Sequence, residues 1–149
     1  DAIDSDFSNG KIESVRFKNI TNDAMDFSGS NVEIYDSNFQ NVKDKLISGG
    51  EESNIQISKI KAINSKSGII SKDGSKIYSN NIFFDNVKIP FAAYQKKSQY
   101  DHGLLVVNDF KVDNFLVKFA KDDKSQITLN NIIQSNAKNN KKMLSLVNQ

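Results

Sequence analysis

The side chains most able to do chemistry gather in one short segment, 94–102, which reads YQKKSQYDH. It contains two tyrosines, two lysines and the only histidine of the chain: Tyr94, Lys96, Lys97, Tyr100 and His102. Aromatic rings can stack on sugar faces, and ammonium groups attract carboxylates and sulfates. The segment therefore predicts a surface that binds acidic glycans. A loop whose tyrosines only anchor it to the rest of the protein is the plainer alternative.

A catalytic acid and base are harder to find. His102 and Tyr100 would make such a couple, but they share one short loop, and no acidic or amide partner for the histidine stands in a convincing register. The sequence has no Gly-rich phosphate loop, no nucleophile elbow and no His-x-x-x-His metal pair. It also has no cysteine, which excludes thiol catalysis. No catalytic residue is assigned.

Two aspartates recur at the same place in two similar segments. Asp4 ends the run DAID and Asp26 ends the run DAMD, with Asp1 and Asp23 at the other ends. If these segments stack, the carboxylates lie one strand spacing apart, where they either repel each other or bind a hard cation through oxygen. Asp4 and Asp26 are therefore a candidate Ca²⁺ site, and a solvated or partly protonated pair is the alternative.

The elements that must position these residues repeat with a period near 22. One asparagine marks each unit, at spacings of 22, 23, 22, 28 and 22: Asn19, Asn41, Asn64, Asn86, Asn114 and Asn136. Two runs of alternating apolar and polar residues precede each asparagine and a short apolar pair follows most of them, which predicts three short strands per unit. No segment shows helical spacing. Because one unit cannot bury its apolar face alone, stacked units must share a core.

Two polar columns support this stacking. The marker asparagines are expected to be buried and to form a structural ladder, each amide bonded to its equivalent one coil away. Eleven residues before each asparagine stands a small residue suited to a tight corner: Ser8, Ser30, Ser53, Ser75, Gly103 and Ser125. The predicted fold is all-β, a single-stranded parallel β-helix of about six coils. We expect one domain over 1–149 that is a fragment of a longer chain.

One break interrupts the repeat. The 28-residue spacing places six extra residues between Ala93 and Leu104, within the segment that holds the histidine. Insertions in solenoids map to loops on one face, which is often the binding face.

Charge and hydropathy argue against two kinds of binding partner, nucleic acid and the membrane interior. The net charge is +2, but residues 1–36 hold eight acids and three bases whereas the remainder holds ten acids and seventeen lysines. Arg16 alone could contact a base edge in bidentate fashion, so no nucleic-acid partner is predicted. No apolar run approaches the roughly 20 residues of a membrane helix, so membrane insertion is not expected either.

The repeats resemble right-handed parallel β-helix repeats of the pectate-lyase-like superfamily. GSNVEIYDSNFQNVKDKLISGGEESNIQI, SGIISKDGSKI and AAYQKKSQY carry the likeness, which covers roughly residues 1–133. It is nearest to segments of large exported bacterial proteins that sometimes accompany spore-coat-H-like kinase domains. The resemblance implies a right-handed coil, an extracellular or cell-surface location and an association with polysaccharides.

Two functions are compatible with these residues. The first is a non-catalytic module of an exported or surface bacterial protein, acting as a stalk, binding acidic polysaccharide, or both, with end-to-end stacking through uncapped coils. The second is a truncated lyase or C5-epimerase acting on uronic-acid polymers. Enzymes of the pectate-lyase type place an arginine over calcium-binding carboxylates, and no arginine here stands near the Asp4 and Asp26 column.

Overall fold

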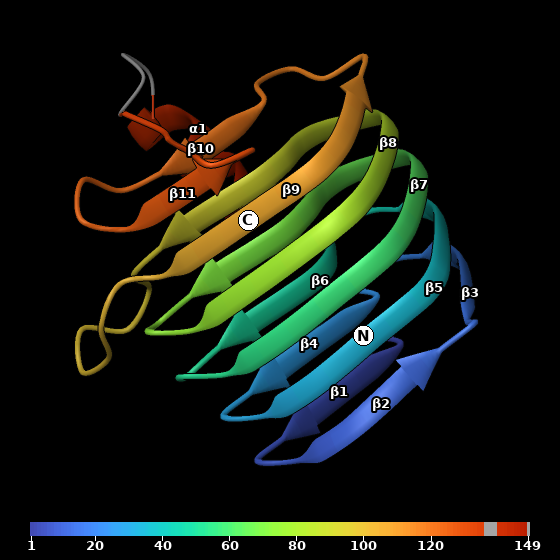
Figure 1. The fold of residues 1–149 in the computed structure, drawn as a ribbon, viewed down its shortest axis with the longest axis horizontal. Helices are drawn as coiled ribbons and strands as arrows, with labels where there is room; N and C mark the ends of the chain where they lie inside the picture. The colour runs from blue at the N-terminus through green and yellow to red at the C-terminus, as the bar shows by residue number, and fades with distance from the viewer. Residues whose placement is uncertain (136–139, 149) are drawn as a thin grey trace.

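The computed structural model describes residues 1–135 and 140–148, so that Asn136 of the predicted ladder lies outside the described residues. It confirms an all-β parallel solenoid of about six turns with a period of about 22 residues. Figure 1 shows the coils stacked from β1 and β2 at the N-terminal end to β11 at the other. The strands are β1 (Ile3–Asp6), β2 (Asn9–Glu13), β3 (Arg16–Ile20), β4 (Met25–Ser28), β5 (Asn31–Val42), β6 (Lys45–Gly50), β7 (Asn54–Lys72), β8 (Lys76–Tyr94), β9 (Leu104–Asp113), β10 (Phe119–Lys121), β11 (Gln126–Leu129) and β12 (Ile132–Ile133).

The strands form three faces, which we name A, B and C. Face A contains β2, β11 and the first parts of β5, β7, β8 and β9. Face B contains β3 and the following parts of the same long strands. Face C contains β1, β4, β6, β10 and the last parts of β7 and β8. Neighbouring coils pair in parallel from β2 to β11 on face A, from β3 to β9 on face B and from β1 to β10 on face C.

Single left-handed residues bend the long strands at the corners. At the corner between faces A and B, Asp36 and Asn81 have φ of 52° and 53°. At the corner between faces B and C, the marker residues Asn41, Asn64 and Asn86 have φ of 56°, 52° and 53°. Asparagine tolerates this conformation better than other residues with a side chain. Because one such residue turns the chain, strands predicted as separate run on as one bent strand.

The core confirms the alternation read from the sequence. Face A buries Ile55, Ile77 and Leu105 completely, and face C buries Ile47, Ile69 and Phe91. On face B the rings of Phe17 and Phe39 are stacked 5.0 Å apart at 10°. Ala62 follows Phe39 in the column, so Phe84 does not stack on Phe39 and instead lies 6.0 Å from the Phe91 ring. The repeat predicts that Phe17, Phe39 and Phe84 share one interior column, and the register confirms this, although ring stacking is limited to the first pair.

The serine column lies at the predicted corner and, beyond that prediction, forms a ladder of hydrogen bonds between coils. Ser30 Oγ accepts a hydrogen bond from the Ser8 amide at 3.0 Å and donates one to the Ser28 carbonyl at 3.0 Å. Ser53 Oγ and Ser75 Oγ accept from the amides of Ser30 and Ser53 in the same way, both at 3.1 Å. Buried polar groups at this corner are thus satisfied from coil to coil.

The asparagine ladder is confirmed in part. Asn41 donates to Asn19 and Asn86 donates to Asn64, each with 2.9 Å between Nδ2 and Oδ1. Asn114 donates to Asp85 instead, at 2.7 Å. The expected burial is wrong, because Asn86 is exposed and Asn41 only half-buried. A corner residue turns its side chain outward, since the left-handed backbone and not an interior amide network selects asparagine there.

The C-terminal end departs from the repeat. The sixth unit should place Ile132 inside a second strand, but β12 turns back antiparallel to β11 and Ile132 is 66% exposed. An unexpected helix, α1 (Asn140–Val147), follows and packs its apolar side against the outer surface of face C. The described part of the chain contains no helix long and apolar enough to span a membrane.

Candidate functional site

The first residue of segment 94–102, Tyr94, is buried. Tyr94 ends β8 and is only 2% exposed, packed with Ile70, Ala92 and Val147 in the cluster beneath α1. Burial raises the pKa of the Tyr94 phenol, and its hydroxyl has no hydrogen-bond partner among the described residues. The prediction that this tyrosine projects from the loop is wrong. It stands in the outward column of face C, where α1 covers it.

The loop after Tyr94 is anchored by contacts with residues of the preceding coils. Asp73, which is 1% exposed, accepts hydrogen bonds from the backbone amides of Lys96 and Lys97 at 2.6 and 2.7 Å. The Lys97 ammonium pairs with the Glu51 carboxylate. Both lysines and the half-buried Tyr100 remain at the surface, but the charge of Lys97 is already matched. These contacts favour an anchored loop, and glycan binding by it stays a prediction.

His102 has the acidic partner that the sequence did not reveal. Its Nδ1 lies 3.2 Å from Asp122 Oδ2, although the two residues are 20 positions apart. Asp122 also accepts from the amides of Gln95 at 2.7 Å and Ser125 at 2.6 Å. Burial opposes ionisation of Asp122, but these hydrogen bonds hold its pKa below the usual range. Its contacts make Asp122 the anchor of two turns, which accounts for the pair without catalysis.

The aspartates of the first coils come together as expected. Asp4 and Asp26 are register partners, and with Asp1 they bring carboxylate oxygens within 4.8 Å of one another. Oxygens at this separation can share one Ca²⁺. Two of the three carboxylates also have protein partners, since Asp26 lies 3.4 Å from the Lys72 ammonium and Asp1 accepts from the Asp23 amide. Ca²⁺ binding here stays a prediction.

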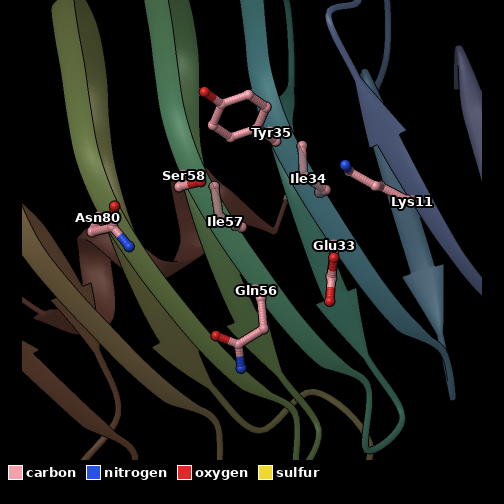
Figure 2. Close-up of a pocket in the computed structure, with 8 residues that line it drawn as sticks. All are labelled: Lys11, Glu33, Ile34, Tyr35, Gln56, Ile57, Ser58 and Asn80. Carbon is pink, nitrogen blue, oxygen red and sulfur yellow. The ribbon is translucent and has the colours of Figure 1, made fainter.

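A hollow of about 220 Å³ lies on the outer surface of face A. Figure 2 shows its lining side chains on four neighbouring strands: Lys11, Glu33, Ile34, Tyr35, Gln56, Ile57, Ser58 and Asn80. Lys11 pairs with Glu13 at 3.0 Å, so the hollow has no excess of positive charge. Its amides, hydroxyls and the ring of Tyr35 could contact sugar hydroxyls, but nothing in it favours an acidic polymer.

A row of outward side chains that includes three cations runs along face B, in contrast to the hollow on face A. Five outward residues stand in register on successive coils, in the order Arg16, Asn38, Lys61, Phe83 and Lys111. The first four line a hollow of about 270 Å³. Phe83 is 37% exposed, and the Lys111 ammonium lies 5.8 Å from the centre of its ring. Cations therefore recur at every second coil of the row, with Asn38 and the ring of Phe83 at the coils between them and neighbouring coils about 4.8 Å apart.

The row was not among the residues predicted from the sequence. It occupies the outward positions between two buried columns, whereas the predicted sites were the insertion and the repeated aspartates. Arg16 and Lys61 have no ion pair among the described residues, in contrast to Lys97 of the loop. Reading each outward column by register would have found them.

A cluster of four charged side chains is nearly buried where face C begins. The Lys45 ammonium lies 3.2 Å from Asp23 and 2.8 Å from Asp44, and Lys66 contacts Asp44 at 3.1 Å. Burial raises the pKa of Asp23. Burial has the same tendency at Asp44, but the hydrogen bonds and charges of Lys45 and Lys66 outweigh it and lower the Asp44 pKa. Asp44 is therefore the carboxylate that holds the cluster together.

Comparison with known proteins adds no relative to this picture: no family model, no curated protein and no solved structure matches the chain. The evidence for the parallel solenoid is therefore the register of its own strands.

Proposed function

We propose that this chain is a non-catalytic β-solenoid module that binds acidic polysaccharide along face B. The row Arg16–Asn38–Lys61–Phe83–Lys111 carries the proposal. The Arg16 guanidinium and the Lys61 ammonium attract the carboxylates of a uronate polymer, and the exposed ring of Phe83 supplies a stacking face. The Lys111 ammonium adds less, because it lies 3.4 Å from the Asp113 carboxylate. A polymer laid along the solenoid axis would meet one side chain of the row at each coil.

The same proposal includes a role as a stalk in an exported or surface bacterial protein. The resemblance of the repeats to the pectate-lyase-like superfamily supports this location and a right-handed coil. The unbroken parallel pairing from β2 through β11 supports a rigid spacer, because each coil is fixed by its neighbours. End-to-end stacking would extend such a stalk.

A lyase or C5-epimerase acting on uronic-acid polymers is the second candidate. The contact between His102 and Asp122 favours it, since a carboxylate that orients an imidazole is a common feature of general bases. The Asp4 and Asp26 pair would not serve the same sugar as this histidine, because Asp26 lies four strand spacings, about 19 Å, from the strand that precedes Asp122. The test is the ultraviolet absorbance of the unsaturated product when the chain is incubated with polygalacturonate or alginate and calcium. A rise that His102→Ala abolishes would establish the lyase and overturn the non-catalytic proposal.

Affinity electrophoresis in gels containing polygalacturonate tests binding directly. We expect Arg16→Gln/Lys61→Gln to weaken retardation by about tenfold, because two exposed ion contacts are lost and at roughly 0.7 kcal/mol each they make up about one decade in affinity. Phe83→Ala should weaken it independently of salt, whereas added salt should weaken the wild-type contact by screening the charges.

Two control variants separate the possible surfaces. Lys76→Gln/Lys124→Gln removes the same charge from exposed lysines outside the row and should bind like the wild type. Lys96→Glu/Lys97→Glu reverses the charge of the predicted loop. Binding that survives the change in the row but fails in the loop variant would move the site to the loop, and no retardation of the wild type would refute binding altogether.

A further inference from the structure

A second hollow with excess positive charge lies away from the face B row, at the corner between faces B and C. It has a volume of about 380 Å³ and is lined by Val42, Lys43, Asn64, Ser65, Lys66, Asn86 and Lys88. Its three lysines come from the same corner of three successive coils, where β5 ends and where β7 and β8 bend. With adjacent strands about 4.8 Å apart, Lys43 and Lys88 leave the backbone roughly 10 Å from each other.

The charges of this hollow are not balanced within the protein. Lys66 contacts Asp44, whose charge is shared with the nearly buried Lys45. Lys43 and Lys88 are exposed, and neither has an ion pair in the described parts of the chain. The corner therefore presents two uncompensated ammonium groups on either side of Lys66. Like charges held this close repel one another, so an anion between them would be favoured.

A neutral donor stands beside the lysines. Asn64 uses its Oδ1 to accept from Asn86 at 2.9 Å, but its Nδ2 has no acceptor among the residues that the structure describes. The asparagine ladder is interrupted at this place, because no hydrogen bond joins Asn41 to Asn64. The left-handed backbone of Asn64, with φ of 52°, fixes the position of this donor.

We propose that this corner is an oxyanion site for a tetrahedral phosphate or sulfate group, separate from the polysaccharide surface of face B. Two unpaired lysines match a charge of about −2, the state that a phosphate monoester approaches at neutral pH. Lysine suits such a group as a point charge with several donors. Lys43, Lys88 and the Asn64 amide would contact the oxygens, and Lys66 would add a shared charge.

Titration of the ¹⁵N-labelled chain with sodium phosphate and, separately, with sodium sulfate tests this site, with sodium chloride of equal ionic strength as the reference. We expect saturable shifts of the backbone amides around Lys43, Ser65, Lys66 and Lys88 that chloride does not produce. A response to phosphate alone identifies a phosphorylated ligand, a response to sulfate alone a sulfated one, and a response to both any tetrahedral oxyanion. No saturable shift with either anion overturns the proposal.

Variants assign the response to the corner. Lys43→Gln/Lys88→Gln should weaken the anion affinity by about tenfold or more, since two contacts to a charged group are lost. Asn64→Gly should weaken it less while keeping the left-handed backbone. Lys76→Gln/Lys124→Gln removes equal charge elsewhere and should leave the affinity within about twofold, because exposed distant charges are screened. Equal loss in both double variants would mean that only net charge matters and would refute a site.

The proposals for the face B row and for the corner can be refuted independently. Arg16→Gln/Lys61→Gln should leave the phosphate or sulfate response unchanged, and Lys43→Gln/Lys88→Gln should leave polygalacturonate binding unchanged. If the corner variant also loses polygalacturonate, the corner belongs to the polysaccharide surface and the separate oxyanion site is wrong. Thermal unfolding of each variant checks that the fold is intact, and these exposed substitutions should shift stability by no more than about 0.5 kcal/mol.

Discussion

At the scale of single residues, the corner asparagines are selected by their backbone conformation. Asn41 has φ of 56° and is half-buried, and its amide bonds to Asn19. Asn41→Ala and Asn41→Gly both remove that bond, but only alanine must hold a Cβ in the left-handed region, at about 1–2 kcal/mol. We therefore expect the alanine variant to be less stable than the glycine variant by about 1 kcal/mol in urea unfolding.

A neighbouring position provides the control for this comparison. Gln40 lies in the extended part of β5, and its φ is not positive. Glycine in a strand interior is less favourable than alanine by roughly 0.5–1 kcal/mol, so the order of the two variants should reverse at Gln40. The same order at both positions would contradict the explanation by left-handed backbone.

Acid should act on the buried ion cluster through two carboxylates with opposite effects. The folded pKa of Asp44 is lowered, so its contribution to stability is complete above the unfolded value of about 3.9 and is lost as the pH falls below it. The folded pKa of Asp23 is raised, so its contribution is largest at low pH and is lost as the pH rises through its folded pKa.

Urea unfolding at a series of pH values separates these contributions. Asp44→Asn should flatten the loss of stability below a pH of about 4, and Asp23→Asn should remove the gain on acidification towards that pH. Asp36→Asn provides a comparison at a more exposed ion pair, with Lys59, and should change the profile little. Identical profiles for the two cluster variants would contradict the opposite shifts.

Residue roles were predictable from the sequence where they depend on alternation, and not where they depend on contacts between coils. The repeat placed Asp4 opposite Asp26 and the serines at one corner, because these follow from register alone. It did not place Asp122 beside His102, since that contact depends on how the inserted loop folds back. It also could not bury Tyr94, whose cover comes from a helix outside the repeat.

At the scale of elements, close packing between strands and corners limits side-chain size. A Cβ at Gly68 would lie 2.1 Å from the Pro90 carbonyl oxygen and 2.6 Å from Phe84 Cε2. We expect Gly68→Ala to destabilise the chain by about 1–3 kcal/mol or more, because backbone of the next coil must move. Gly10→Ala is the matched control: nothing lies within 4 Å of its Cβ, so thermal unfolding should show no loss.

The elements that the sequence analysis missed are those that leave the repeat. Helix α1 has only eight residues, and its apolar side is set by Met143, Leu144 and Val147, a pattern too short to distinguish from chance. It folds because face C offers an apolar outer surface at Ile70 and Ala92. Strand β12 reverses direction after two left-handed asparagines, Asn130 and Asn131, where the repeat alone predicts another parallel strand.

At the scale of the whole molecule, stability is a sum of coils and their interfaces. In such a stack each coil contacts only its neighbours, so local changes should spread unevenly. Strands β1, β2 and β3 pair on one side only, whereas β7 pairs with coils on both sides. Amide hydrogen exchange should therefore be fastest in β1–β3 and slowest in β7 and β8.

Replacing one stacked ring in the second coil tests whether the solenoid behaves in this way. Phe39 is 2% exposed and stacks on Phe17, so Phe39→Ala should cost about 3–5 kcal/mol. We expect the loss of hydrogen-exchange protection to be largest in β2, β3 and β5 and smallest in β9 and β11, because the cavity weakens the interfaces of the second coil first. Phe83→Ala removes a partly exposed ring from the outer surface of the same face and should leave the protection pattern unchanged.

An equal loss of protection in every strand of Phe39→Ala would mean that the chain opens as a single cooperative unit. The face B row would then be presented only by the fully folded molecule, and polysaccharide binding should fall in parallel with global stability rather than with the stability of the first coils.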